Sequence, residues 1–134
     1  MLCSLNNHTK YQLAGSEHIS ANCLETLSHS KDAKIRARVA EHVNTSLRTL
    51  LRLVQDEDSE VRQSVALNPN ANTALLYQLA KDQNPDVRYA VAEDPNTPKM
   101  VLASLTVDEN PYVAHRALQT VLKVSGLQQV SQAA

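Results

Sequence analysis

Acidic and basic residues recur six positions apart along the chain, and these pairs are its first candidates for chemistry. Asp56 precedes Arg62 by six positions, Asp82 precedes Arg88 by the same spacing, and Asp108 continues the acidic series. A carboxylate beside a guanidinium can perturb the ionisation of both groups, as happens in active sites. Because an active site occurs once in a chain whereas this pair recurs, we expect a structural role instead.

Asparagine recurs with equal regularity at Asn44, Asn70 and Asn96, which are evenly spaced along the chain. Asparagine side chains bond to the backbone of turns and tolerate tight conformations. We therefore expect these residues to support a turn between helices, and contact with a ligand is the alternative.

Two neighbouring acid–histidine pairs, Glu17–His18 and Glu41–His42, suggest a metal site. Zinc or iron needs ligands at equivalent positions on stacked helices, or at i and i+4 on one helix. These pairs do not share the spacing of the asparagines, and the five histidines do not share it either. The two glycines of the chain also provide neither a phosphate-binding loop nor a nucleophile elbow. We expect no enzymatic activity, no cofactor and no metal.

The recurring aspartates, arginines and asparagines all follow the same 26-residue period. One repeat position holds an aliphatic residue each time: Ile35, Val61, Val87 and Val113. The complete repeats are 35–60, 61–86 and 87–112, preceded by a degenerate repeat 9–34 and followed by a half repeat 113–124 and a short tail 125–134. A fixed period of this length with atypical ends is characteristic of a solenoid, and we predict a single domain over residues 1–134.

Each repeat contains the signals of two short helices. The first helix follows an Asx residue that can accept the free N–H groups of the first turn: Asp32, Asp58, Asn84 or Asn110. In the third complete repeat, the second helix is predicted to begin at Thr97–Pro98 and to run to about Val107. The pattern predicts an all-α fold, a right-handed α-solenoid of tandem 26-residue two-helix repeats.

At "DQNPDVRYAVAEDPNTPKMVLASL", residues 82–105, the sequence resembles the leucine-rich repeat variant family, a relative of HEAT-like α-solenoids. The resemblance covers roughly residues 9–124 and implies a solenoid fold in which the recurring aspartates and arginines form a hydrogen-bonded structural ladder. Members of that family include an iron–sulfur protein with an N-terminal cysteine cluster. This chain has only Cys3 and Cys23, so the cluster does not carry over. Related folds include a DNA glycosylase, metal-dependent hydroxylases and many protein-binding scaffolds.

The outward positions of the predicted second helices carry apolar side chains beside cations. The residues expected to contact a partner are Arg48, Leu51, Arg52, Tyr77, Gln78, Lys81 and Met100. Apolar residues rimmed by cations are typical of a protein-contact patch, whereas scattered exposed apolar residues are the ordinary alternative. We predict that the partner is another protein, whose identity the sequence does not give.

Residues 31–52 are rich in lysine and arginine, which makes nucleic-acid binding the alternative function. Arg48 and Arg52 could contact phosphates, and Tyr77 could stack on a base. The positions equivalent to the two arginines are uncharged in the next repeats, where Ala74, Gln78, Met100 and Ser104 occupy them. A solvated, salt-bridged face explains the same charges.

Composition and the terminal segments bear on localisation and on self-association. The formal net charge is −1, the segment "MLCSLNNHTK" lacks the apolar run of a signal peptide, and no apolar stretch is long enough to span a membrane. We expect a cytoplasmic protein with no membrane association. The half repeat keeps Leu118 and Val121 without a complete second helix to cover them, so we expect a monomer or a weak dimer through the C-terminal repeat.

Overall fold

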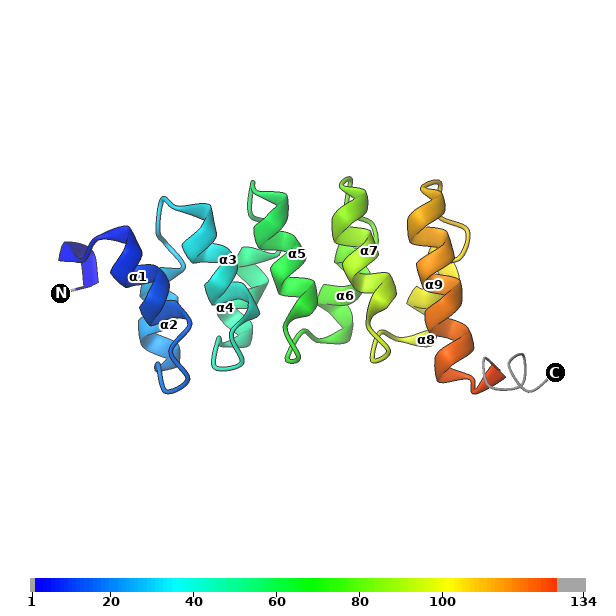
Figure 1. The fold of residues 1–134 in the computed structure, drawn as a ribbon, viewed down its shortest axis with the longest axis horizontal. Coiled ribbons are helices and arrows are strands. Elements are labelled where there is room, and N and C mark those ends of the chain that lie inside the picture. The colour runs from blue at the N-terminus through cyan, green and yellow to red at the C-terminus, as the bar shows by residue number, and fades with distance from the viewer. Residues whose placement is uncertain (1, 128–134) are drawn as a thin grey trace. The chain divides into compact units, whose positions relative to one another are not determined.

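The computed structural model describes residues 2–127, and helices are the only regular elements within that range (Figure 1). The all-α prediction is confirmed for these residues. The chain divides into two compact units, Met1–Ala71 and Asn72–Ala134. Among the described residues, no helix combines the length and the apolar character needed to cross a membrane.

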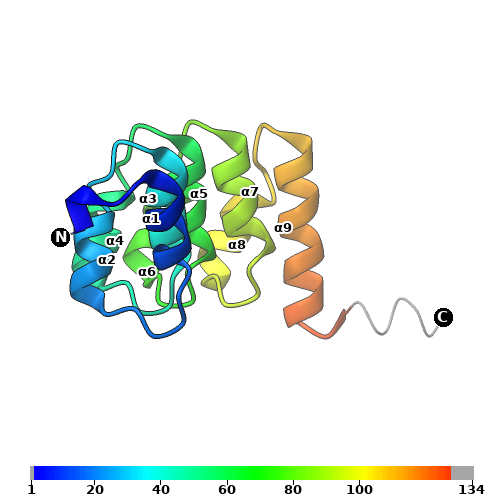
Figure 2. The same ribbon diagram turned by 60° about the vertical axis from the view of Figure 1, so that its left-hand side comes forward.

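The first unit is built from short helices that alternate along the chain. Its elements are the 3-10 turn Leu2–Ser4 and the helices α1 (Asn7–Ala14), α2 (Ala21–Leu27), α3 (Ala33–Glu41), α4 (Leu47–Leu53) and α5 (Ser59–Leu67). Helix α3 packs against both α1 and α5. Figure 1 shows these three helices side by side, and in the turned view of Figure 2 α1 lies in front of α3. Helix α4 contacts α3 and α5. No helix here is long enough to be stable alone in water, so each depends on its neighbours.

The second unit contains the remaining helices. These are α6 (Thr73–Leu79), α7 (Pro85–Glu93), α8 (Lys99–Leu105) and α9 (Pro111–Val124). Helix α9 packs against α7 and α8, and α7 also contacts α6 and α8. The half repeat 113–124 thus lies within one helix, α9, while residues 128–134 of the predicted tail lie outside the described residues.

Asx residues begin the first helix of each complete repeat, as the sequence predicts. The side chain of Asp58 accepts a hydrogen bond from the Glu60 N–H, and that of Asn84 accepts one from the Asp86 N–H. Pro85 and Pro111 occupy the first helical positions of α7 and α9, where a missing N–H leaves no bond unmade. Local chemistry alone is therefore enough to place these helix starts.

The start of α8 differs from the prediction. The helix begins at Lys99 after Pro98, which makes no side-chain capping bond, and it ends at Leu105 instead of near Val107. Thr97 is buried at 3% exposure, and its hydroxyl donates to the Val91 carbonyl oxygen at 2.8 Å. Thr97 therefore completes the C-terminal end of α7 and does not cap α8.

Aliphatic side chains fill the interior of each unit. The repeated alanine position, held by Ala14, Ala40, Ala66 and Ala92, is at most 1% exposed. A methyl side chain at this position lets neighbouring helix backbones approach closely. Leucines and valines occupy most of the remaining interior positions, so the scaffold needs no aromatic core residue.

Candidate binding surfaces

A buried ion pair joins α7 to the turn before α9. Arg88 Nε donates to Asp108 Oδ2 at 2.8 Å, and its Nη2 donates to Oδ1 at 3.1 Å. Its Nη1 donates to the main-chain carbonyl of Asp82 at 2.7 Å. The carboxylate that binds Arg88 thus comes from the aspartate that follows it in the next repeat, which corrects the pairing of Arg88 with the carboxylate of Asp82.

The same arrangement occurs in the first unit at Arg36, which the predicted ladder left out. Arg36 Nε donates to Asp56 Oδ2 at 2.8 Å, Nη2 to Oδ1 at 3.1 Å, and Nη1 to the Ser30 carbonyl at 2.9 Å. Arg62 donates to the Asp56 carbonyl at 2.8 Å. Arg36 lies one period before Arg62, so the regular spacing contained the signal for it.

Both residues of the Arg88–Asp108 pair remain charged. The hydrogen bond with Asp108 raises the pKa of Arg88, although burial opposes that effect. Burial raises the pKa of Asp108, but hydrogen bonds from Arg88 and from the Asn110 N–H outweigh it, and the net pKa is lowered. A pair held ionised in this way joins segments and is unsuited to proton transfer at neutral pH.

The repeated asparagines lie in turns between helices. Asn44 Nδ2 donates to the Ile19 carbonyl at 3.0 Å, and Asn70 Nδ2 donates to the Val43 carbonyl at 2.7 Å. Asn96 occupies the corresponding turn between α7 and α8. Asn44 and Asn70 therefore satisfy carbonyl groups of the turn one repeat earlier, which is a structural role.

Asn68 and His42, which the sequence did not predict, also bond to backbone groups of turns. Asn68 is 2% exposed, and its Nδ2 donates to the carbonyls of Ala40 at 2.7 Å and His42 at 2.9 Å. His42 Nε2 lies 2.9 Å from the Ser16 carbonyl, and its Nδ1 accepts from the Asn44 N–H at 2.9 Å. A carbonyl only accepts, so Nε2 carries the proton. Both ring nitrogens of His42 are thus engaged by backbone groups.

In the first unit, the predicted partner residues surround a hollow between α2 and α4. The hollow has a volume of about 530 Å³ and is lined by Glu25, His29, Arg48, Leu51 and Arg52. Leu51 is 49% exposed. The repeat pattern therefore placed Arg48, Leu51 and Arg52 on the surface correctly.

Glu25 lines this hollow and makes contacts with three neighbouring side chains. Its carboxylate accepts from the Thr49 hydroxyl and lies 3.2 Å from Arg52 Nη2 and 3.2 Å from His29 Nε2. The Thr49 hydrogen bond lowers the pKa of Glu25, burial opposes it, and His29 and Arg52 lower it further. Arg52 also donates to the Ser28 hydroxyl. Glu25 lies one period before Leu51, at an outward position of the second helices, but the period does not predict its contacts with Thr49 and Arg52.

Further side chains lie next to this hollow. Leu47 is 45% exposed and lies one helical turn before Leu51 on α4. A second hollow of about 430 Å³ shares Glu25 and His29 with the first and is also lined by Cys3 and Lys10. Sequence spacing could not indicate this neighbourhood, because Cys3 precedes the first repeat.

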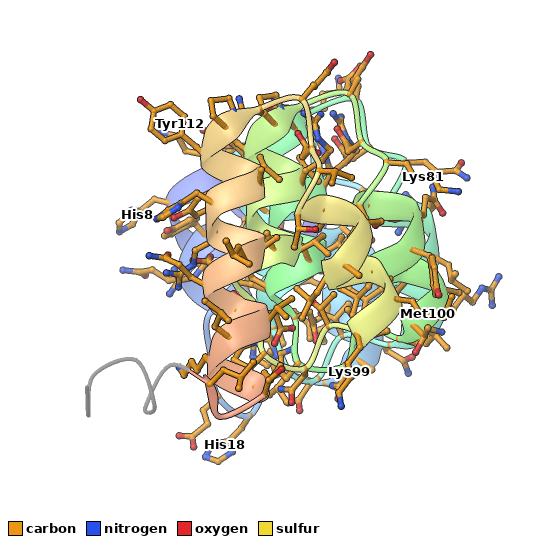
Figure 3. The ribbon with its side chains drawn as sticks, turned by 90° about the vertical axis from the view of Figure 1, so that its right-hand side faces the viewer. His8, His18, Lys81, Lys99, Met100 and Tyr112 are labelled. Carbon is orange, nitrogen blue, oxygen red and sulfur yellow. The ribbon has the colours of Figure 1, made fainter. Side chains whose placement is uncertain are left out.

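In the second unit, the predicted partner residues lie on α6 and α8 and in the turn after α6. Tyr77 is 39% exposed and Met100 is 75% exposed, and Gln78 and Lys81 are also on the surface. Figure 3 shows Lys81 and Met100 projecting on the same side of this unit. This is the composition that the sequence predicted for a contact surface.

The basic residues of segment 31–52 are dispersed over the first unit. Arg36 is paired with Asp56, and Arg52 is paired with Glu25. The Arg38 guanidinium lies over the Tyr11 ring of α1, 4.4 Å from its centroid. These arginines occupy separate environments and do not form one cationic strip.

Comparison of the chain with protein-family models, curated proteins and solved structures finds no significant match. Among residues 2–127, no three histidine, cysteine, aspartate or glutamate side chains are grouped so that they could hold a metal ion.

Proposed function

We propose that the chain is a right-handed α-solenoid of 26-residue repeats that works in the cytoplasm as a protein–protein interaction module. The resemblance to leucine-rich repeat variants supports this architecture. Further support comes from Arg36 and Arg88, which lie two periods apart and bind aspartates in the same manner. Repeat scaffolds of this kind bind other chains through extended surfaces.

One observation carries the proposal, the apolar and cationic composition of the hollow between α2 and α4. Leu47 and Leu51 expose apolar surface on α4, and Arg48 is exposed beside them without an ion pair to any described residue. The Glu25 network fixes the neighbouring Arg52, so part of the surface is ordered before a partner arrives. Preorganised side chains lose less entropy on binding. This surface suits a partner segment with an apolar and an acidic side chain.

The second unit contributes its own part of the proposed surface. Tyr77 and Met100 are residue types that favour interfaces, because both cover a large contact area. Gln78 and Lys81 supply polar groups around them. Each unit thus offers residues of its own for contact with a partner protein.

The nucleic-acid alternative has less support. Binding to phosphates needs lysine and arginine side chains that are not already paired within the protein. The affinity for nucleic acid grows with the number of such side chains. Arg36 and Arg52 are paired with carboxylates within the protein and Arg38 lies over Tyr11, so half of the six basic residues of segment 31–52 are engaged internally.

Site-specific photo-crosslinking tests the proposal. A photoreactive residue placed at position 51 or 77 should crosslink the same protein from an extract of the source cell, and mass spectrometry identifies it. Position 107 is the control, because Val107 is 83% exposed but lies outside the proposed surface. Arg48→Glu should abolish the crosslink at position 51. The proposal fails if position 107 captures the same proteins, or if Arg48→Glu changes nothing.

A further inference from the structure

A tyrosine-lined hollow lies between the first turns of α7 and α9 in the second unit. It has a volume of about 270 Å³, and its lining residues are Pro85, Asp86, Tyr89, Asn110, Tyr112 and Val113. Tyr112 is 78% exposed and Tyr89 is 36% exposed. Tyr112 projects on the opposite side of the unit from Met100 (Figure 3), so this hollow is separate from the proposed partner surface.

A tyrosine at the same repeat position in the first unit contacts an arginine. Tyr11 lies three periods before Tyr89, and the Arg38 guanidinium lies over its ring at 4.4 Å from the centroid. Arg38 Nη1 also donates to the Tyr11 hydroxyl at 3.1 Å. Gly15 makes room for this arrangement, because a Cβ there would overlap the guanidinium. The first unit thus contains a closed arginine–tyrosine pair.

The equivalent pair in the second unit is open. Arg116 stands at the same spacing from Tyr89 as Arg38 does from Tyr11, but Glu93 replaces Gly15 at the third position. Arg116 Nη2 lies 4.0 Å from Glu93 Oε2, and Nη1 donates to Gln119 Oε1 at 3.4 Å. Within residues 2–127, Arg38 over Tyr11 is the one cation–π contact, so the Tyr89 ring has no cation on it.

We propose that this hollow binds an arginine side chain of another polypeptide. The faces of Tyr89 and Tyr112 attract a cation, and the exposed Asp86 carboxylate, which has no bond to a described residue, supplies the counter-charge. A guanidinium fits best, since it stacks flat on a ring and binds a carboxylate with two donors. A nucleotide fits poorly, because its phosphates would be repelled by Asp86.

The helix starts around the hollow do not oppose a cation strongly. The N-terminus of a helix carries partial positive charge on its free N–H groups. Here Asn84 accepts from the Asp86 N–H, and Asn110 accepts from the Tyr112 and Val113 N–H groups. Pro85 has no N–H, and the Asp86 carboxylate lies in the first turn of α7. The charge of Asp86 therefore dominates at this position.

Aromatic NMR spectra of the whole protein test the proposal directly. The chain has four tyrosines, no phenylalanine and no tryptophan, so each ring can be assigned by single substitutions. The probe is the peptide acetyl-Gly-Arg-Gly-amide, with acetyl-Gly-Gln-Gly-amide as its neutral control. We expect the arginine peptide alone to shift the Tyr89 and Tyr112 rings, while Tyr11, already covered by Arg38, and Tyr77 stay unchanged.

Two acid substitutions separate a site from general charge attraction. Asp86→Asn should weaken binding of the arginine peptide about threefold to fivefold, the effect expected for an exposed ion pair. Glu109→Gln makes the same change of charge at a side chain that is 92% exposed and outside the hollow, and it should leave binding unchanged. Equal loss in both variants would overturn the proposal.

Tyr89→Leu provides a second, independent test. It should abolish the shift of the Tyr112 ring while the amide spectrum shows a folded protein. The inference is wrong if the arginine peptide shifts no tyrosine or all four, if Tyr112 still shifts in Tyr89→Leu, or if a thymidine oligonucleotide shifts the two rings instead. Leu51→Asp should not affect the titration, so failure of the proposed partner surface and failure of this site are distinguishable.

Discussion

Arg88 carries its charge into the interior of the second unit, and Asp108 neutralises it there. The two side chains are 9% and 8% exposed. Asp108→Ala should lower the free energy of unfolding by about 3 kcal/mol, because it leaves a buried guanidinium without its counter-charge. Urea denaturation measures the change, and Glu109→Ala, at a highly exposed acid, should stay within about 0.5 kcal/mol of the wild type. Equal midpoints for Asp108→Ala and wild type would exclude a stabilising role for the pair.

The ionisation of Asp108 also predicts how stability depends on pH. Burial raises its pKa, the hydrogen bonds from Arg88 and Asn110 outweigh that effect, and the folded-state pKa is lower than the unfolded value of about 3.9. The unfolded state therefore binds the proton more readily. The contribution of Asp108 is present above about pH 3.9 and is lost as the pH falls through the folded value. When the pH is lowered from about 5 to about 3, the free energy of unfolding should fall less in Asp108→Asn than in the wild type. Equal falls in the two proteins would contradict this.

The partner of each arginine could not be decided from spacing alone. An arginine in this repeat has one aspartate six positions before it and another in the following repeat. The prediction paired each arginine with the nearer aspartate. In the structure the Asp82 carboxylate accepts from the Asn84 N–H at 2.9 Å, while its main-chain carbonyl faces Arg88. Which oxygen an aspartate offers depends on the shape of the turn, and periodicity does not contain that information.

Local sequence signals predict some helix starts correctly and others incorrectly. An Asx residue before a first helix caps it in every complete repeat, because the capping bond spans only two positions. Thr97–Pro98 carries an equally good local signal for a cap, yet the Thr97 hydroxyl bonds to the Val91 carbonyl. The need to satisfy a buried carbonyl at the end of α7 overrides the local preference.

Substitution of Thr97 tests this corrected role. Thr97→Val keeps the shape but removes the hydroxyl, and it should lower the free energy of unfolding by about 1 kcal/mol through the lost hydrogen bond. Thr97→Ser keeps the hydroxyl and should cost less. Thermal or urea unfolding compares the two variants. If valine is tolerated as well as serine, the hydroxyl bond contributes nothing to stability.

At the scale of the whole molecule, the period predicts the scaffold and its outward positions, whereas the contacts within the candidate sites depend on residues that do not repeat. Glu25 and His29 belong to the degenerate repeat, and the open Tyr89 exists because Glu93 stands where the first unit has Gly15. Repetition identifies residues that perform the same structural task in each repeat. It gives no signal for residues that occur once, and those residues distinguish one binding protein from another.

The dispersal of the basic residues predicts weak or no binding to nucleic acid. Arg36, Arg38 and Arg52 each have a partner within the first unit, so half of the six basic residues of segment 31–52 are engaged internally. An electrophoretic mobility assay with a short DNA or RNA at about 50 mM salt should show no shift at micromolar protein. A shift that weakens with salt and disappears in Arg48→Glu with Arg52→Glu would favour the nucleic-acid function over the protein-binding one.

Self-association is expected to involve α9 and not the proposed partner surface. Val113, Ala117 and Thr120 face the interior of the second unit, whereas Leu118 is 47% exposed and Val124 is 38% exposed. Exposed apolar side chains along a 14-residue helix form a surface that a second copy of the chain could cover. Solenoids normally avoid such association because their terminal repeats carry polar residues on the outer face.

Any dimer seen by analytical ultracentrifugation should therefore dissociate in Leu118→Glu with Val121→Glu. Leu51→Asp with Tyr77→Asp should leave the dimer intact, because both residues are exposed on other helices. A dimer that persists in the α9 variant and is lost in the other would place self-association on the partner surface.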